Sequence, residues 1–284
     1  MEIKNLANLP TDIIYGAFSK AFFDYSAISL NFASFTQLIE RRGFCPELSF
    51  GAFADGELVS FTLNGTGLYQ GVKTAYDTGT GTVPDFRGQG LARRIFLESK
   101  PALKAAGINQ YLLEVLQDNF KAVPLYRSMG FETIREFQYF STKADSVKPN
   151  PGPKAQSFIL KSSLIPDPDT LTPFHDFHPS WQNSFESISR RPQDFRFIGA
   201  YHHEQLAGYG ISDPSTGDIT QLAVDKNFRR QGIATAILKE LLLINNFETI
   251  KIINTVKDCT SINGFLQHLG LSPAGSQFEM ICKL

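Results

Sequence analysis

A short turn, Arg87-Gly88-Gln89-Gly90-Leu91-Ala92, has the clearest chemistry in this sequence. It follows a predicted strand ending at Val83-Pro84 and precedes an apolar repeat of helical spacing, so its amides lie at a predicted helix N-terminus. Such an end leaves up to four N–H groups unpaired, and the helix dipole there favours negative charge. Because both glycines let a ligand approach the main chain closely, the turn predicts a site for a diphosphate.

The same pattern occurs again in the second half of the chain. The segment FRGQGLARRIFLE from Phe86 aligns without gaps with FRRQGIATAILKE from Phe228. The second turn reads Arg229-Arg230-Gln231-Gly232-Ile233-Ala234 and is the more positively charged. A repeat of this length indicates a duplicated domain rather than a solenoid of short units.

Two other phosphate-binding classes are disfavoured by the same turns. The dinucleotide fingerprint needs a third glycine or an alanine where Arg93 and Thr235 stand. No Walker lysine follows either turn, which excludes a P-loop nucleotide triphosphatase.

Further residues follow the first turn in a fixed order: Asn119, Ala122, Leu125-Tyr126 and Gly130-Phe131. Together with the turn they resemble the motifs of the GNAT superfamily of N-acetyltransferases. The resemblance covers residues 49–140 well and 195–284 moderately. It implies an α/β (α+β) fold of two tandem GNAT-like domains, each with a mixed, mostly antiparallel sheet flanked by helices, and acetyl-CoA as acyl donor.

The resemblance also implies roles for individual positions. Strand main chain would pair with the pantetheine arm, loop amides would hold the pyrophosphate, Asn119 would meet the pantetheine or thiol region, and Tyr126 would protonate the departing thiolate. Cys259 and Leu266 stand at the last two positions in the second half, which therefore lacks the hydroxyl. The predicted cofactor-binding residues are Thr82, Val83, Arg87, Gly88, Gln89, Gly90, Leu91, Ala92, Asn119, Val224, Arg229, Arg230, Gln231, Gly232, Ile233 and Ala234.

Acyl transfer to an amine needs more than a donor site. The amine must be neutral to attack, the oxyanion needs a hydrogen-bond donor, and the sulfur leaves more easily when protonated. Asp77 and Glu114, on the strands before the first turn and before Asn119, are both candidates for the general base. Their second-half counterparts, Ile219 and Asn254, cannot act as carboxylate bases.

The elements that position these residues follow the same order in both halves. We expect a GNAT-like domain over residues 1–145, a Pro-rich linker over 146–156 and a degenerate second GNAT-like domain over 157–284. The extra motifs of the first domain predict that catalysis lies there. The predicted helices are Thr11–Asp24, Phe32–Arg42, Gly90–Ala106, Lys121–Met129, Ser180–Ser189, Gly232–Leu243 and Ser261–His268. The predicted strands are Leu48–Phe53, Glu57–Asn64, Thr74–Val83, Gln110–Leu116, Ile134–Phe140, Phe195–Tyr201, Gln205–Ser212, Asp218–Val224, Thr249–Asn254 and Gln277–Cys282.

Bulk composition bounds the remaining possibilities. A formal net charge of −1 provides no polycationic field for nucleic-acid binding. Three scattered cysteines fit a reducing cytoplasm, and the start of the chain lacks the pattern of a secretory signal. His175, His178, His202 and His203 have no recognisable ligand spacing, so we expect no metal. We expect a soluble, cytoplasmic protein without membrane or nucleic-acid partners, as a monomer or homodimer.

The sequence thus predicts an acetyl-CoA-dependent N-acetyltransferase that acts directly on a primary amine of a small molecule or peptide. Two alternatives stay open at this point. The protein could be a non-catalytic module that binds or senses acyl-CoA, or catalysis could lie in the C-terminal half.

Overall fold

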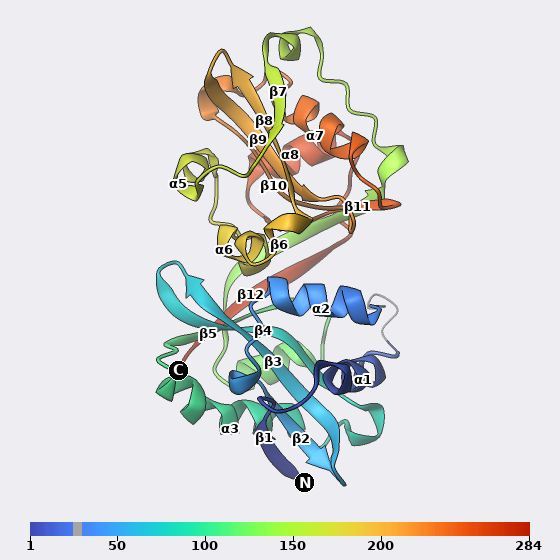
Figure 1. The fold of residues 1–284 in the computed structure, drawn as a ribbon, viewed down its shortest axis with the longest axis vertical. Helices are drawn as coiled ribbons and strands as arrows, with labels where there is room; N and C mark the ends of the chain where they lie inside the picture. Colours follow the sequence, from blue (N-terminus) through green and yellow to red (C-terminus); the bar gives the residue numbers. More distant parts are fainter. Residues whose placement is uncertain (25–29) are drawn as a thin grey trace. The chain divides into compact units, whose positions relative to one another are not determined.

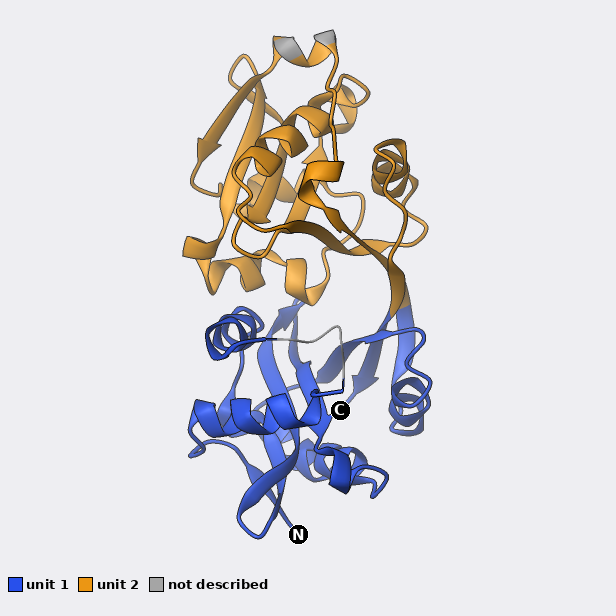
Figure 2. Ribbon diagram, turned by 90° about the vertical axis from the view of Figure 1, so that its right-hand side faces the viewer, with its two compact units in different colours: residues 1–134, 278–284 blue, residues 135–277 orange. Residues whose placement is uncertain are grey.

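The computed structural model describes residues 1–24 and 30–284, which form two compact units (Figures 1 and 2). Unit 1 comprises Met1–Ile134 and Phe278–Leu284, and unit 2 comprises Arg135–Gln277. Each unit combines helices with a mixed, mostly antiparallel sheet, which confirms the predicted fold class. No helix among the described residues is long and apolar enough to span a membrane.

Unit 1 contains a sheet with neighbours in the order β1-β2-β3-β4-β5-β12. Its strands are β1 (Glu2–Asn5), β2 (Phe50–Ala54), β3 (Glu57–Tyr69), β4 (Val72–Thr82), β5 (Gln110–Leu116) and the end of β12 (Gly275–Lys283). Strands β1 to β4 run antiparallel, whereas β4 and β5 are parallel. The turn Asp55-Gly56 has φ values of 49° and 84°, the tight-turn geometry that matches strand twist and joins β2 to β3.

The helices of unit 1 cover both faces of this sheet. They are α1 (Thr11–Ala21), α2 (Phe32–Arg41), α3 (Leu91–Ala105) and α4 (Ala122–Ser128). Phe18 of α1 and Phe35 of α2 share an apolar cluster with Phe61 of β3. Ile95 of α3 packs in a separate cluster with Val59 of the same strand. The sheet is therefore held between two helical layers, which fixes the ends of β4 and α3 next to each other.

Unit 2 repeats this plan with strands in the order β6-β11-β10-β9-β8-β7. The strands are β6 (Glu132–Lys143, from Arg135 on), β7 (Ile159–Ser163), β8 (Arg196–His202), β9 (Gln205–Asp213), β10 (Asp218–Val224) and β11 (Thr249–Val256). The helices are α5 (Pro168–Leu171), α6 (Phe185–Ser189), α7 (Ile233–Leu243) and α8 (Thr260–His268). Ile237 of α7 packs against Ala207 of β9, while Ile188 of α6 belongs to a different cluster with Tyr209.

A β-bulge occurs at the same place in both units. The register between β3 and β4 shifts at Thr78, and the register between β9 and β10 shifts at Thr220. The parallel pairing ends two residues before each bulge. Strands β4 and β5 are registered only as far as Tyr76↔Leu112, and strands β10 and β11 only at Asp218↔Lys251. Each pair of parallel strands therefore separates toward the end that carries the loop.

The unit boundaries differ from the expected division at residues 146–156. The last strand of each half, β6 in the first and β12 in the second, crosses into the other unit; we call these two the closing strands. Strand β6 pairs with β11, from Phe137↔Val256 to Lys143↔Thr249, and not with the sheet of its own half. Strand β12 leaves unit 2 after Gln277 and lies next to β5 in unit 1.

Core packing explains this exchange of closing strands. Phe140 of β6 joins the apolar cluster of Ile250 in unit 2, and Met280 of β12 joins the cluster of Tyr111 in unit 1. Backbone hydrogen bonds are the same for any strand, so these buried side chains select the partner. The residue pattern of β6 or β12 alone therefore does not predict which sheet the strand joins.

Two predicted segments differ from their expected form. The segment expected as a linker packs on unit 2, because Val147 is buried in the cluster around α7. The predicted helix Ser180–Ser189 is interrupted, since Ser184 caps the N-terminus of α6 by accepting a hydrogen bond from Ser187 N at 3.1 Å. Serine in this position ends the preceding turn and starts a new helix.

Candidate active site

The two glycine-containing loops have the same backbone conformation. Gly88 and Gly90 have φ values of 76° and 71°, and the corresponding Arg230 and Gly232 have φ values of 61° and 82°. An arginine in the left-handed region is uncommon, so the second loop keeps the conformation despite the loss of a glycine. The repeat seen in the sequence is therefore a repeat of geometry.

Each loop presents unpaired amides at the start of a helix. In the described chain, no backbone N–H of residues 88–93 or 230–235 donates to a backbone carbonyl. The first backbone bonds of the two helices are Arg94 N to Gly90 O and Ala236 N to Gly232 O. These amides are free to bind an anion at the two positions where the sequence predicts such a site. Arg87 differs from the prediction, because its N–H donates to Pro84 O at 3.1 Å in the turn before the loop.

An arginine side chain connects each loop to the end of the preceding strand by a hydrogen bond. Arg87 Nε donates to Thr82 O at 3.1 Å, and its guanidinium pairs with both carboxylate oxygens of Asp24. Arg229 Nε donates to Val224 O at 3.0 Å, and its guanidinium pairs with Asp176. The arginine hydrogen bond holds the pKa of Asp24 below its usual value. The two arginines therefore act through their side chains as clamps on the loop.

The strand residues predicted to bind the pantetheine arm already have protein partners. Val83 N donates to Val59 O at 2.9 Å, and Val83 O accepts from Phe86 N at 2.9 Å. The carbonyls of Thr82 and Val224 each accept from a clamp arginine. The parallel ladder beside these residues is registered only as far as Tyr76↔Leu112 in unit 1 and only at Asp218↔Lys251 in unit 2.

Asp77 and Tyr126, predicted as base and acid, lie together in unit 1. Tyr126 Oη donates to Asp77 Oδ2 at 3.1 Å, and Thr80 Oγ1 donates to the same oxygen at 2.8 Å. Burial raises the pKa of Asp77 and, helped by the nearby carboxylate, raises the pKa of Tyr126 well above its ordinary value. The phenol therefore stays protonated at neutral pH, as a proton donor must.

Glu114, the other candidate base, belongs to a different contact. Burial first, and the carboxylate of Glu114 second, raise the pKa of the buried Tyr76 phenol, which is hydrogen-bonded to Glu114. The structure thus brings Asp77, and not Glu114, to the hydroxyl of Tyr126.

Asn119 has a structural role at the start of α4. Its Oδ1 accepts a hydrogen bond from Ala122 N at 3.0 Å, which satisfies one of the free amides of this helix end. Cys259, at the corresponding position, makes no side-chain cap for α8.

We expect Asn119→Ala to lower the free energy of unfolding of unit 1 by about 1 kcal/mol, because the cap is lost. Asn119→Asp retains an acceptor oxygen and serves as the matched control, with stability close to that of the unchanged chain. Urea unfolding followed by far-ultraviolet circular dichroism measures both variants. Equal stability of Asn119→Ala and Asn119→Asp would contradict the capping role.

We also expect a pH-dependent gain in stability for Asp77→Asn. Since burial raises the pKa of Asp77, the folded state binds more protons than the unfolded state between the two pKa values. The free energy of unfolding therefore falls as pH rises through this window, and the buried charge is fully present above it. Asparagine still accepts from Thr80 and Tyr126 but carries no charge.

The gain for Asp77→Asn should be about 1 kcal/mol near neutral pH and should vanish near pH 3, where the carboxyl is protonated in both states. Urea unfolding at the two pH values makes this comparison, with Asp55→Asn in an exposed turn as the control. A difference that does not change with pH would show that the buried charge is not the cause.

Unit 2 replaces the polar pair of unit 1 by an apolar one. Ile219 and Leu266 stand at the positions of Asp77 and Tyr126, and both are buried in one apolar cluster. Because both positions are apolar, neither a carboxylate nor a phenol is left there without its hydrogen-bond partner.

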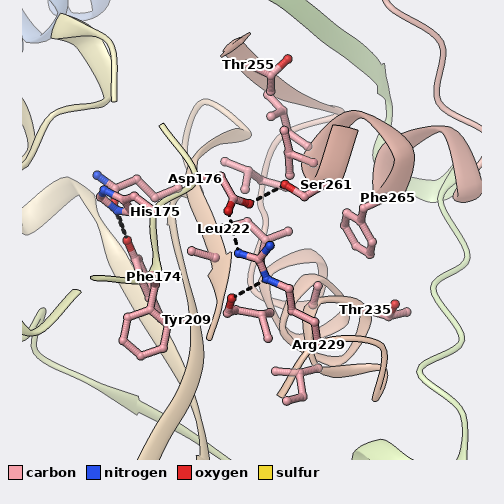
Figure 3. A pocket seen from close by; sticks show the side chains of 18 of the residues that line it. Phe174, His175, Asp176, Tyr209, Leu222, Arg229, Thr235, Thr255, Ser261 and Phe265 are labelled. Carbon is pink, nitrogen blue, oxygen red and sulfur yellow. Dashed lines mark hydrogen bonds and ion pairs between the residues drawn. The ribbon is translucent and has the colours of Figure 1, made fainter. Parts of the chain in front are cut away.

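Unit 2 contains an open cavity of about 750 Å³, lined by residues of both β10 and β11 (Figure 3). Arg229 and Thr235 of the loop and helix α7 form one wall, and Phe265 of α8 contributes to another. His175 and Tyr209 line the cavity on the side away from Thr235 and Phe265 (Figure 3). The cavity thus extends from the predicted anion site to a group of polar side chains.

The sequence did not single out this polar group as a site. In the sequence, His175 suggests at most a metal ligand, and Tyr209, Gln221 and Asn183 belong to no motif. These residues come from separate segments, so no spacing pattern connects them. In the described part of the chain, no group of three or more His, Cys, Asp or Glu side chains is arranged to hold a metal ion.

Comparison with known proteins places the chain in a family. Residues 12–131 and 163–254 match the model of the acetyltransferase (GNAT) family. These two segments cover more than half of the chain, and each contains one of the loops.

Individual relatives match over shorter segments. An acetyltransferase of Pectobacterium atrosepticum is 32% identical over 97 residues, which are 34% of this chain and 66% of that protein. A mycothiol acetyltransferase of Thermobifida fusca is 39% identical over 69 residues, which are 24% of this chain and 21% of that protein. In both cases the chain matches less than two thirds of the relative's length.

Solved structures resemble the whole chain. A tandem GNAT protein from the clavulanic acid biosynthesis pathway aligns over 99% of this chain and 98% of its own, with a TM-score of 0.72 and 15% identity. A GCN5-related N-acetyltransferase from Sphaerobacter thermophilus covers 99% and 95%, with a TM-score of 0.70 and 14% identity. At such identity the likeness concerns the fold, and it confirms the tandem arrangement. With the family match in both halves, the chain belongs to the acetyltransferase (GNAT) family and is an acyltransferase.

Proposed function

We propose that the protein transfers the acetyl group of acetyl-CoA directly to a primary amine. The carrying observation is that each unit combines unpaired loop amides at a helix N-terminus with parallel strands that separate beside them. Loop amides suit a diphosphate, and strand edges without a ladder partner suit the amide groups of a pantetheine arm. Acetyl-CoA carries both groups together with a thioester.

The space beside the loops is compatible with this donor. A Cβ added at Gly88 or Gly90 would meet no atom within 4 Å, so the first loop has an open side. The cavity of about 750 Å³ in unit 2 has the size of a small-molecule site and begins at the second loop.

In unit 1, Asp77 and Tyr126 supply a route for the proton. As the amine nitrogen bonds to the thioester carbon, Asp77 takes a proton from the nitrogen. Tyr126 gives its proton to the sulfur as the carbon–sulfur bond breaks, and the proton on Asp77 then returns to Tyr126 through their hydrogen bond. The raised pKa of Asp77, caused by burial, favours its brief protonation.

The acceptor we propose is a primary amine of a small molecule or of a peptide. A non-catalytic module that binds or senses acyl-CoA is the competing possibility. It would use the loops but would give no role to the partly buried Asp77–Tyr126 pair.

The test incubates the full chain with acetyl-CoA and a panel of alkylamines, amino acids, amino sugars and peptides. We expect release of free thiol that depends on the amine, with a matching gain of one acetyl group by the amine in mass spectra. Reactions without amine measure simple hydrolysis. Calorimetric binding of acetyl-CoA without thiol release for any amine would contradict transfer and support the binding module.

A further inference from the structure

His175 belongs to a hydrogen-bonded chain whose proton positions can be derived. Gln221 Nε2 donates to Asn183 O at 2.7 Å, which leaves Gln221 Oε1 as the acceptor facing Tyr209. Tyr209 Oη donates to that oxygen at 2.7 Å, so the phenol has no proton left for histidine. His175 Nε2 lies 2.5 Å from Tyr209 Oη and must therefore donate to it.

This assignment leaves Nδ1 of His175 as a bare acceptor. Among the described residues, His175 contacts Tyr209 through Nε2, interacts with the side chain of Gln221, and stacks on Phe185 with centroids 5.7 Å apart and planes inclined by 14°. A neutral imidazole with one nitrogen fixed and the other free has the form of a general base.

The surroundings of His175 keep the imidazole neutral. Burial lowers the pKa of His175, and His178 acts in the same direction, whereas Gln221 and Asp176 oppose this shift. The elements packed against the ring contribute Phe185 from α6, the uncharged phenol Tyr209 from β9 and the amide Gln221 from β10. Asp176 is itself paired with Arg229, which reduces its effect on the imidazole.

His175 lies in the lining of the unit 2 cavity. His175 and Tyr209 line the unit 2 cavity on the side away from Thr235 (Figure 3), and Gln221 and Asn183 also belong to its lining. The loop with the unpaired amides lines the same cavity. A donor bound by its diphosphate at the loop and extended along the separated strands would carry its thioester toward these side chains.

We propose that unit 2 contains a second acyl-transfer site, in which Nδ1 of His175 accepts the proton of a primary amine. The proposal rests on the proposed function, because it needs an acyl-CoA donor. His175 would supply unit 2 with a proton acceptor, although Ile219 and Leu266 replace Asp77 and Tyr126 there. Tyr209 and Gln221 are positioning residues, since they fix the tautomer.

The step balances without a further reactant. The amine nitrogen forms a bond to the thioester carbon, and His175 Nδ1 takes a proton from that nitrogen. The carbon–sulfur bond breaks, and the thiolate takes a proton from the imidazolium, directly or through water. The products are an amide, the free thiol and neutral His175.

The activity test uses a Tyr126→Phe background, in which unit 1 lacks its proposed proton donor. We expect this chain to keep amine-dependent thiol release, and we expect His175→Gln in the same background to lower that kcat by about 10²-fold. His203→Gln, at an exposed histidine of unit 2 outside the cavity, is the control and should leave kcat unchanged. Added imidazole should restore thiol release to His175→Ala in this background.

A second measurement does not depend on activity. Nitrogen chemical shifts of ¹⁵N-histidine protein should show one histidine with Nε2 protonated, with a pKa below the ordinary value, that is absent from His175→Gln. Tyr209→Phe removes the oxygen that accepts from Nε2 and should shift this signal toward a mixture of tautomers.

The outcomes separate the two proposals. A wild-type chain that releases no thiol with any amine contradicts the proposed function. Thiol release that is abolished by Tyr126→Phe alone, or that His175→Gln leaves unchanged in the Tyr126→Phe background, overturns the second site while the proposed function stands. A His175 signal protonated at Nδ1 overturns the assignment of the base.

Discussion

Tyr126→Phe is expected to lower kcat for acetyl transfer at unit 1 by about 10²-fold, while the KM for acetyl-CoA changes little. The phenol is partly buried, protonated and bonded to Asp77 at 3.1 Å, so we expect its hydroxyl to act on the leaving sulfur and not on donor binding. Phenylalanine keeps the ring that packs against Phe131. Steady-state thiol release, measured in a His175→Gln background, isolates unit 1 from any transfer by unit 2.

The matched control for this prediction is Tyr15→Phe. Tyr15 is another partly buried tyrosine of unit 1, and its hydroxyl donates to Leu30 O at 2.9 Å, far from the loop in sequence. We expect its kcat to match that of the unchanged chain. If Tyr126→Phe and Tyr15→Phe have equal kcat in the His175→Gln background, the hydroxyl of Tyr126 is not the proton donor.

Gly232→Ala is expected to destabilise unit 2 by roughly 3 kcal/mol, whereas Gly90→Ala should cost unit 1 only about 1 kcal/mol. Both glycines have positive φ, so alanine strains the backbone equally at the two positions. A Cβ at Gly232 would lie 2.0 Å from Pro151 O, but a Cβ at Gly90 would meet nothing within 4 Å. Only the Gly232 variant must therefore displace the segment that packs over its loop.

Trp181 is the single tryptophan of the chain and is buried in unit 2, so its fluorescence follows unfolding of that unit. Urea unfolding of Gly232→Ala by fluorescence, and of Gly90→Ala by circular dichroism, gives the two free energies. Gly264→Ala, at an open helical position of unit 2, is the control for Gly232→Ala. Equal losses at Gly232 and Gly90 would show that contact with Pro151 does not determine the cost.

Most of the secondary structure could be predicted because its signals are local. The turn Asp55-Gly56, the apolar repeat after Gly90 and the alternating strands each depend on neighbouring residues. Short edge strands β1 and β7 were missed, since few residues with exposed side chains provide little periodic signal. Strand β3 continues to Tyr69, five positions beyond Asn64, because pairing with β4 extends it.

Some features of the candidate site could likewise be predicted from the local sequence, whereas others depend on the fold. Both loops were predicted with their residues, because glycine positions and the following helix determine the free amides locally. Asp77 and Tyr126 were predicted separately, and only the fold brings them within hydrogen-bond distance. The resemblance assigns Asn119 to the donor, and the structure adds that its Oδ1 caps the start of α4.

The sequence by itself determined the duplication, the two glycine-containing loops and the membership of both halves in one fold class, since these depend on local conformation and on direct comparison of segments. Only the tertiary structure decided that β6 and β12 change units and that His175, Tyr209 and Gln221 meet at one cavity. Strand pairing uses backbone groups that every residue carries, and side chains from separate segments meet only when the core is packed.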